Sequence, residues 1–97
     1  MLLTNFRLVD GTGRGVRTGL MLLIREGRIA ALEADLTIPG EEILDLGGRT
    51  LLPGLTDLHI HLGGGESLGE PQMRGDETLY ERKCEQLLDW GVTTVRT

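Results

Sequence analysis

Three side chains suited to metal or acid–base chemistry follow one another at intervals of two: Asp57, His59 and His61. Alternate side chains of a β-strand leave on the same side, so a strand over 55–62 presents all three on one face. Such a polar stripe is costly to bury unless something binds it. Two imidazoles about 6.6–7 Å apart along a strand can share one divalent ion at bond lengths near 2.1 Å. We therefore predict that His59 and His61 are metal ligands.

Other roles for these side chains are open. Two histidines spaced two apart in a soluble domain commonly lie on the surface. Here Pro53-Gly54 breaks the chain just before the strand and Gly63-Gly64-Gly65 ends it, a context that favours metal ligands. For Asp57 we prefer a hydrogen bond to neighbouring backbone or to a ligand histidine over direct coordination. No catalytic general base is assigned to this chain.

The run from Leu52 to His61 resembles the first barrel strand of the amidohydrolase superfamily of metal-dependent hydrolases. Other segments resemble parts of that superfamily in the expected order, including imidazolonepropionase-like and Xaa-Pro dipeptidase-like members. These segments are Asp10-Gly11-Thr12-Gly13, 24–29, 44–49 and 91–96. The resemblance covers essentially the whole chain.

The resemblance implies an α/β fold: the start of a metal-dependent hydrolase (β/α)8 TIM barrel, preceded by part of a small N-terminal β-sandwich. We expect the β-sandwich portion at 1–52 and the first β-α-β unit of the barrel at 53–97. A complete barrel needs about 200–250 residues, whereas this chain has 97. We therefore expect an incomplete N-terminal fragment whose partner is the missing C-terminal part of the barrel.

The activity implied by the resemblance is hydrolysis of carbon–nitrogen bonds by a metal-activated water. The substrate class is a small molecule with a non-peptide amide, cyclic amide or dipeptide bond. Zinc is the default metal, while iron, manganese and nickel also suit imidazole ligands. We expect no activity from this chain alone, because catalytic zinc typically has three protein ligands and only two are assigned here. The alternatives are one chain of a split hydrolase and a non-catalytic β-domain module.

Composition limits the partners. The formal net charge of −5 disfavours nucleic acid and anionic membrane surfaces. The longest apolar run, 20–24, is far short of the about 20 residues that span a bilayer, and the first residues lack the pattern of a signal peptide. The single cysteine, Cys84, allows no internal disulfide and suits a reducing cytoplasm. We expect a cytoplasmic protein with no nucleic-acid or membrane partner.

The expected elements follow from periodicity and breakers. Asp10–Gly15 predicts a hairpin connection, because no helix follows to make it a phosphate-binding loop. The run 20–24 is apolar on both faces, which calls for more cover than a fragment offers. We expect strands at 2–9, 20–25, 28–33 and 43–46, a two-residue turn at Glu26-Gly27, a helix at 77–90, and a strand at 92–96 parallel to 55–62.

Finer expectations concern the loop and helix of the second half. The loop carboxylates Glu66 and Glu70 are expected to be solvated, and Lys83 lies outside the positions at which the superfamily carries its ligands. Asp76 or Thr78 can cap the helix and Gly91 can close it. Cys84 and Trp90 are interpreted as packing residues. Strands 20–24 and 92–96 are expected to have unpaired edges.

Overall fold

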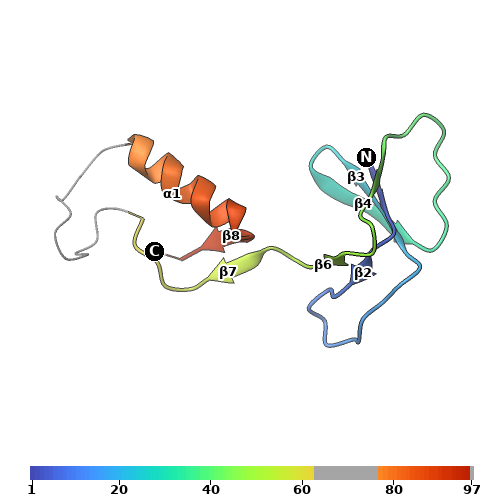
Figure 1. Ribbon diagram of the computed structural model, residues 1–97, viewed down its shortest axis with the longest axis horizontal. Coiled ribbons are helices and arrows are strands. Elements are labelled where there is room, and N and C mark those ends of the chain that lie inside the picture. Colours follow the sequence, from blue (N-terminus) through green and yellow to red (C-terminus); the bar gives the residue numbers. More distant parts are fainter. Residues whose placement is uncertain (63–76, 97) are drawn as a thin grey trace. The chain divides into compact units, whose positions relative to one another are not determined.

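The computed structural model describes residues 1–62 and 77–96, which form parts of two compact units (Figure 1). The units are Met1–Pro53 and Gly54–Thr97, and each is described here by itself. We expected the boundary one residue earlier, between 52 and 53. No helix in the described ranges is long and apolar enough to cross a bilayer.

The first unit is built on a four-stranded sheet in the order β4-β3-β1-β5. Strand β1 pairs antiparallel with β3 and parallel with β5, while β3 also pairs antiparallel with β4. Since β3 is an interior strand, our expectation of an unpaired edge at 20–24 is wrong. The strands are β1 (Leu2–Thr4), β3 (Met21–Arg25), β4 (Arg28–Glu33) and β5 (Ile43–Asp45), with a separate parallel pair of β2 (Arg7–Leu8) and β6 (Thr50–Leu51).

The core of this unit forms around β1 and β3. Leu22 and Leu23 are consecutive and point to opposite faces of β3, yet their exposed fractions are only 5% and 7%. The doubly apolar run is therefore covered on both sides, and our expectation that a fragment could not cover it is wrong. One cluster of buried residues comprises Leu3, Phe6, Leu8 and Leu22. Each such side chain contributes about 1.5–3 kcal/mol to folding when fully buried.

The first strand is interrupted at Asn5, so the single strand expected over 2–9 is wrong. Asn5 has φ of 54°, a left-handed conformation that asparagine tolerates better than most residues. Its Nδ2 donates to Asp45 Oδ1 at 2.8 Å, and its carbonyl accepts from the Gly48 N–H at 2.7 Å. The reversal allows β1 and β2 to pair in different sheets.

Two connections in this unit follow the sequence-based expectations. Glu26 and Gly27 have φ of 49° and 70°, the two positive values required by a type I′ hairpin turn. In the glycine-rich loop, Asp10 Oδ1 accepts from the Thr12 hydroxyl at 2.5 Å and from its N–H at 3.0 Å. The Thr12 hydroxyl is the main cause of a lowered pKa of the Asp10 carboxyl. An antiparallel bridge between Leu8 and Arg17 closes the loop, which confirms a hairpin-type connection.

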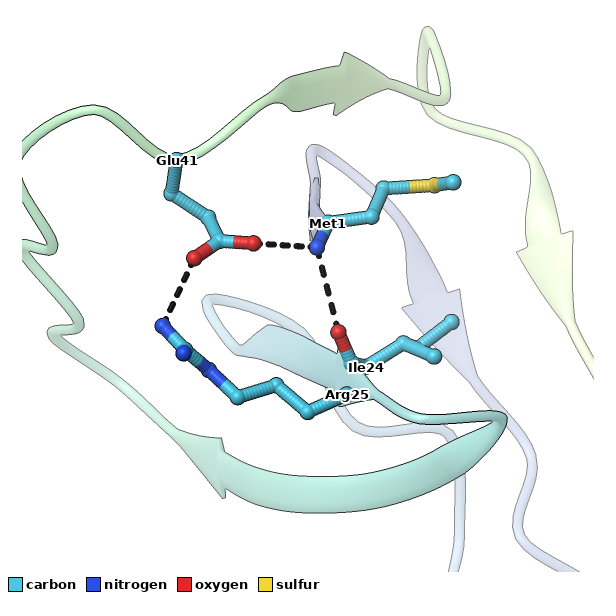
Figure 2. Close-up of polar contacts among 4 residues, drawn as sticks. All are labelled: Met1, Ile24, Arg25 and Glu41. Atoms are coloured by element: carbon cyan, nitrogen blue, oxygen red, sulfur yellow. Dashed lines mark hydrogen bonds and ion pairs between the residues drawn. The ribbon is translucent and has the colours of Figure 1, made fainter.

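A carboxylate joins the start of the chain to the β3–β4 hairpin (Figure 2). The Met1 α-amino group donates to the Ile24 carbonyl at 3.1 Å and to Glu41 Oε1. Glu41 Oε2 accepts from Arg25 Nη2 at 2.7 Å. These partners lower the pKa of the Glu41 carboxyl, chiefly through the hydrogen bond from the α-amino group and then through the charge of Arg25.

We predict that Glu41→Gln destabilises the first unit at neutral pH, because it removes the negative partner of two cations. A lowered folded-state pKa means that this contribution is complete above the ordinary value of 4.5 and is lost as pH falls through the folded value. The urea midpoint of the variant, followed by circular dichroism, should therefore lie below that of the parent at pH 7. The two midpoints should converge in acid.

The matched control for this prediction is Glu42→Gln. It makes the same change in charge at the next residue, which is exposed and forms no ion pair among the residues described. Equal midpoint shifts for the two variants would show that only net charge matters.

The second unit contains a β-α-β arrangement with parallel strands. Strand β7 (Leu55–Asp57) pairs with β8 (Val92–Val95), and helix α1 (Glu77–Asp89) lies between them in sequence (Figure 1). Gly91, with φ of 80°, ends the helix and donates from its N–H to the Leu88 carbonyl at 2.9 Å. The parallel pairing and the closing role of Gly91 are thus confirmed. Asp76, one of the two residues expected to cap the helix, lies outside the described residues.

The exposed face of α1 differs from our expectation. Cys84 is exposed and Trp90 retains 83% of its accessible surface, so the packing roles predicted for both are wrong. Leu88 is also 59% exposed, whereas Lys83 and Leu87 are half-buried. Two short strands cover only a narrow strip of a 13-residue helix, which leaves the rest of its surface in contact with solvent.

Gly54 is required by the close approach of β8. A Cβ at this position would overlap three atoms of the Thr93 side chain. One of them is the Thr93 Cβ, at 2.7 Å, so a change of Thr93 rotamer would not relieve the overlap. The Pro53-Gly54 break therefore has a packing reason as well as a conformational one.

We predict that Gly54→Ala destabilises the β7–β8 pairing by about 1–3 kcal/mol, the usual cost of an overpacked site. Hydrogen exchange should report the loss at the Leu55 N–H, which donates to the Gly91 carbonyl at 2.8 Å. Gly15→Ala is the control, because its φ is not positive and no described atom lies within 4 Å of the new Cβ. Unchanged protection of Leu55 in Gly54→Ala would contradict the overlap.

Candidate functional site

The segment that carries the histidines leaves β7 through a bend at Asp57. Its Oδ1 accepts a hydrogen bond from the His59 backbone N–H at 3.0 Å, the geometry of an Asx-type turn. The Asp57 carbonyl accepts from Arg96 N–H at 2.8 Å, and Ile60 N–H donates to the Arg96 carbonyl at 3.2 Å. The strand predicted over 55–62 is therefore wrong beyond Asp57, because this carboxylate turns the backbone out of the ladder.

The bend brings the two imidazole rings together. His59 Nε2 and His61 Nε2 are 3.3 Å apart, the ring centroids are separated by 5.2 Å, and the ring planes meet at 69°. Both residues are exposed, whereas Asp57 is half-buried. The two rings thus meet through a turn rather than through the alternation of an extended strand.

This separation fits two chemical arrangements. Two nitrogens bound to one zinc at about 2.1 Å each lie about 3.4 Å apart when the angle between the bonds is tetrahedral. The observed 3.3 Å is close to that value. It also suits an N–H···N hydrogen bond between two neutral rings in which one Nε2 carries the proton. The donor set therefore fits a divalent metal, and it offers the ion two imidazole ligands.

The described residues supply no third ligand. Within 1–62 and 77–96, no three or more histidine, cysteine, aspartate or glutamate side chains are grouped so that they could hold an ion. The loop carboxylates Glu66 and Glu70 lie outside the described residues. The Asp57 carboxylate bonds to the backbone, which is the role that we preferred for it from the sequence.

A hollow of about 420 Å³ lies beside His61. Ile60 and His61 line it from the segment after β7. Four residues of α1 and its end, at spacings of three, one and three, line it from the other side: Lys83, Gln86, Leu87 and Trp90. The spacing of these residues in the sequence already indicates a single helical face. We missed it because we interpret Trp90 as a packing residue and place Lys83 outside the superfamily's ligand positions.

Comparisons with known proteins identify relatives by sequence. A scan against protein-family models found no match. The chain is 44% identical over 61 residues to an imidazolonepropionase of Klebsiella pneumoniae (strain 342), covering 62% of this chain and 15% of that protein. It is 37% identical over 67 residues to a dihydroorotase of Bacillus thuringiensis (strain Al Hakam), covering 67% of this chain and 15% of that protein.

Two crystal structures resemble the fold. One, of a protein described as an amidohydrolase, matches with a TM-score of 0.58 and 31% identity, over 63% of this chain and 15% of that one. The other, of phenylurea hydrolase B, matches with a TM-score of 0.62 over 97% of this chain and 23% of that one. Because its sequence identity to this chain is 23%, this match shows a similar fold and nothing more.

The chain is similar to members of the amidohydrolase superfamily over part of their length, which confirms the resemblance drawn from its motifs. It spans about 15% of the length of the curated relatives that it matches.

We predict that His59→Ala and His61→Ala each weaken zinc binding by at least about tenfold, because each removes one of two imidazole ligands. The measurement is a zinc titration against a metal indicator dye. It should be made in a Cys84→Ser background, so that the exposed thiol does not compete for zinc. Unchanged affinity in either histidine variant would show that this residue is not a ligand.

Asp57→Asn is the matched control for the histidine variants. It keeps the Oδ1 acceptor that bends the backbone at His59 and removes only the charge. Zinc affinity within a few-fold of the parent is expected if Asp57 acts on the backbone. A loss as large as that in the histidine variants would instead assign the carboxylate to the metal.

Proposed function

We propose that this chain is part of a metal-dependent amidohydrolase that cleaves carbon–nitrogen bonds, with His59 and His61 as metal ligands. The observation that supports it most directly is the 3.3 Å separation of the two Nε2 atoms in a chain similar to members of this superfamily. Imidazole nitrogens suit zinc, which we take as the default, and also iron, manganese and nickel.

The two units have a place in this proposal. We assign Met1–Pro53, with its sheet and buried core, to the small β-domain, and Gly54–Thr97 to the first β-α-β unit of a TIM barrel. The parallel pairing of β7 and β8 supports the second assignment, since parallel neighbours joined through a helix are the repeating unit of such barrels. The histidines follow the carboxyl end of β7, the end at which barrel active sites lie.

The chain's own residues prepare the site. Asp57 fixes the backbone of His59, and the turn presents both Nε2 atoms to one point. Ligation through Nε2 leaves each Nδ1 to carry the ring proton. A metal held there would polarise a carbonyl and lower the pKa of a water molecule to about 7.

We propose a small molecule with an amide-type bond as the substrate: a non-peptide amide, a cyclic amide or a dipeptide. The names imidazolonepropionase, dihydroorotase and phenylurea hydrolase belong to the relatives and support the class only. Further ligands and the general base are assigned to parts of the superfamily fold that this chain does not span. Two other arrangements remain to be distinguished: one chain of a split cytoplasmic hydrolase, and a non-catalytic β-domain module.

A chimeric enzyme tests the proposal. Residues 1–97 would replace the matching part of the Klebsiella pneumoniae imidazolonepropionase, and hydrolysis of a cyclic amide would be followed with and without a chelator. We expect no turnover by the 97-residue chain alone. The chimera should be active, and His61→Ala should lower its activity by about 100-fold or more, because outer partners of metal ligands alone are worth 10–100-fold.

The control in the chimera is Arg82→Gln, an exposed position of α1 that does not line the hollow beside His61. Its activity should equal that of the chimera. A separate second chain that restores activity without fusion would favour the split enzyme. Full activity of the His61→Ala chimera would contradict the proposed site, and turnover by residues 1–97 alone would contradict the division of the catalytic groups.

A further inference from the structure

The hollow beside His61 has the chemistry of a binding site for an anion. Its lining contains the Lys83 ammonium, the Gln86 amide and the His61 imidazole, all of which can donate hydrogen bonds. Among the described residues, none that lines the hollow is a carboxylate, although Glu85 and Asp89 lie on the same helix. In a chain of net charge −5, a concave surface that carries a lysine ammonium and two further hydrogen-bond donors favours a negatively charged ligand.

The side chains that line the hollow favour a planar ligand. Trp90 keeps 83% of its surface exposed, so a face of its indole is available for stacking. Ile60 and Leu87 add apolar surface between the indole and the donors. The volume of about 420 Å³ lies within the range of small-molecule sites, about 300–1,000 Å³.

We infer that this hollow binds a small planar carboxylate, with Lys83 pairing with the anion and Trp90 stacking on the ring. Lys83 lies on α1 and Trp90 directly follows its last residue; the seven-residue spacing, two helical turns, brings both to the same side. Lys83 is half-buried, which strengthens its pairing relative to a fully solvated lysine. The inference goes beyond the proposed hydrolysis and shares only His61 with the proposed metal site.

The test uses benzoate as the probe and the fluorescence of Trp90, the single tryptophan of the chain. The full 97-residue chain is titrated in the presence of a chelator, so that the result is independent of metal binding by the histidine pair. We expect saturable quenching with a dissociation constant on the order of 1 mM, as suits a ligand of this size. Benzamide, which is planar and neutral, should bind about tenfold more weakly.

Substitutions identify the anion partner. Lys83→Gln should weaken benzoate binding about tenfold, the value of one charge-assisted hydrogen bond, and Lys83→Arg should restore it to within a few-fold. Arg82→Gln makes the same change of charge one residue away, outside the hollow, and should bind as the parent does. Far-ultraviolet circular dichroism verifies that α1 persists in each variant.

Three results would overturn the inference. They are the absence of saturable quenching, equal affinity for benzoate in Lys83→Gln and the parent, and equal weakening by Arg82→Gln and Lys83→Gln. Since a chelator is present throughout, each result concerns the hollow alone. Unchanged zinc affinity in the histidine variants would instead count against the proposed hydrolase site.

Discussion

The backbone pairing at Asp57 is the interaction on which the arrangement of the site depends. Its carbonyl accepts from Arg96 and so holds the end of β7 against the chain after β8. Its carboxylate accepts from the His59 N–H and turns the backbone away from the strand. One residue therefore ends the regular strand and begins the bend, beyond which only the bond from the Ile60 N–H to the Arg96 carbonyl continues the pairing. The meeting of the two imidazoles follows from both bonds of Asp57. Without the bend, the rings would be spaced by strand geometry alone.

The two units are stabilised by different means. Every buried side chain in the described ranges belongs to Met1–Pro53, where apolar residues cover both faces of β3. In the described part of Gly54–Thr97, strand pairing, the end of α1 and the turn at Asp57 hold the chain through hydrogen bonds. A ligand that binds the folded form of this second unit would stabilise it by mass action, so its order and its binding chemistry are linked.

Local signals made part of this structure predictable from sequence. The turn at Glu26-Gly27, the end of α1 at Gly91 and the parallel β-α-β connection each follow from a few neighbouring residues. The reversal at Asn5 could not be predicted from neighbouring residues, because its partners Asp45 and Gly48 are about 40 residues away in sequence. The spacing of His59 and His61 identified them as a pair, but it predicted the wrong backbone, since Asp57 can either continue a strand or start an Asx-type turn. The exposure of Trp90 depends on how much of the helix surface the strands cover. The spacing of apolar residues in the sequence does not give that extent.

The contact between the imidazoles has a consequence for metal binding. Two neutral rings whose Nε2 atoms are 3.3 Å apart can form an N–H···N hydrogen bond, and a metal ion held by His59 and His61 would replace that bond. The cost is small, because a typical intramolecular hydrogen bond contributes about 0.5–1.5 kcal/mol net. In return, the rings already lie near the separation required by two bonds of about 2.1 Å. That hydrogen bond would hold the two proposed ligands close to this separation. Metal binding would then require one ring to carry its proton on Nδ1 in place of Nε2, with no rearrangement of the backbone.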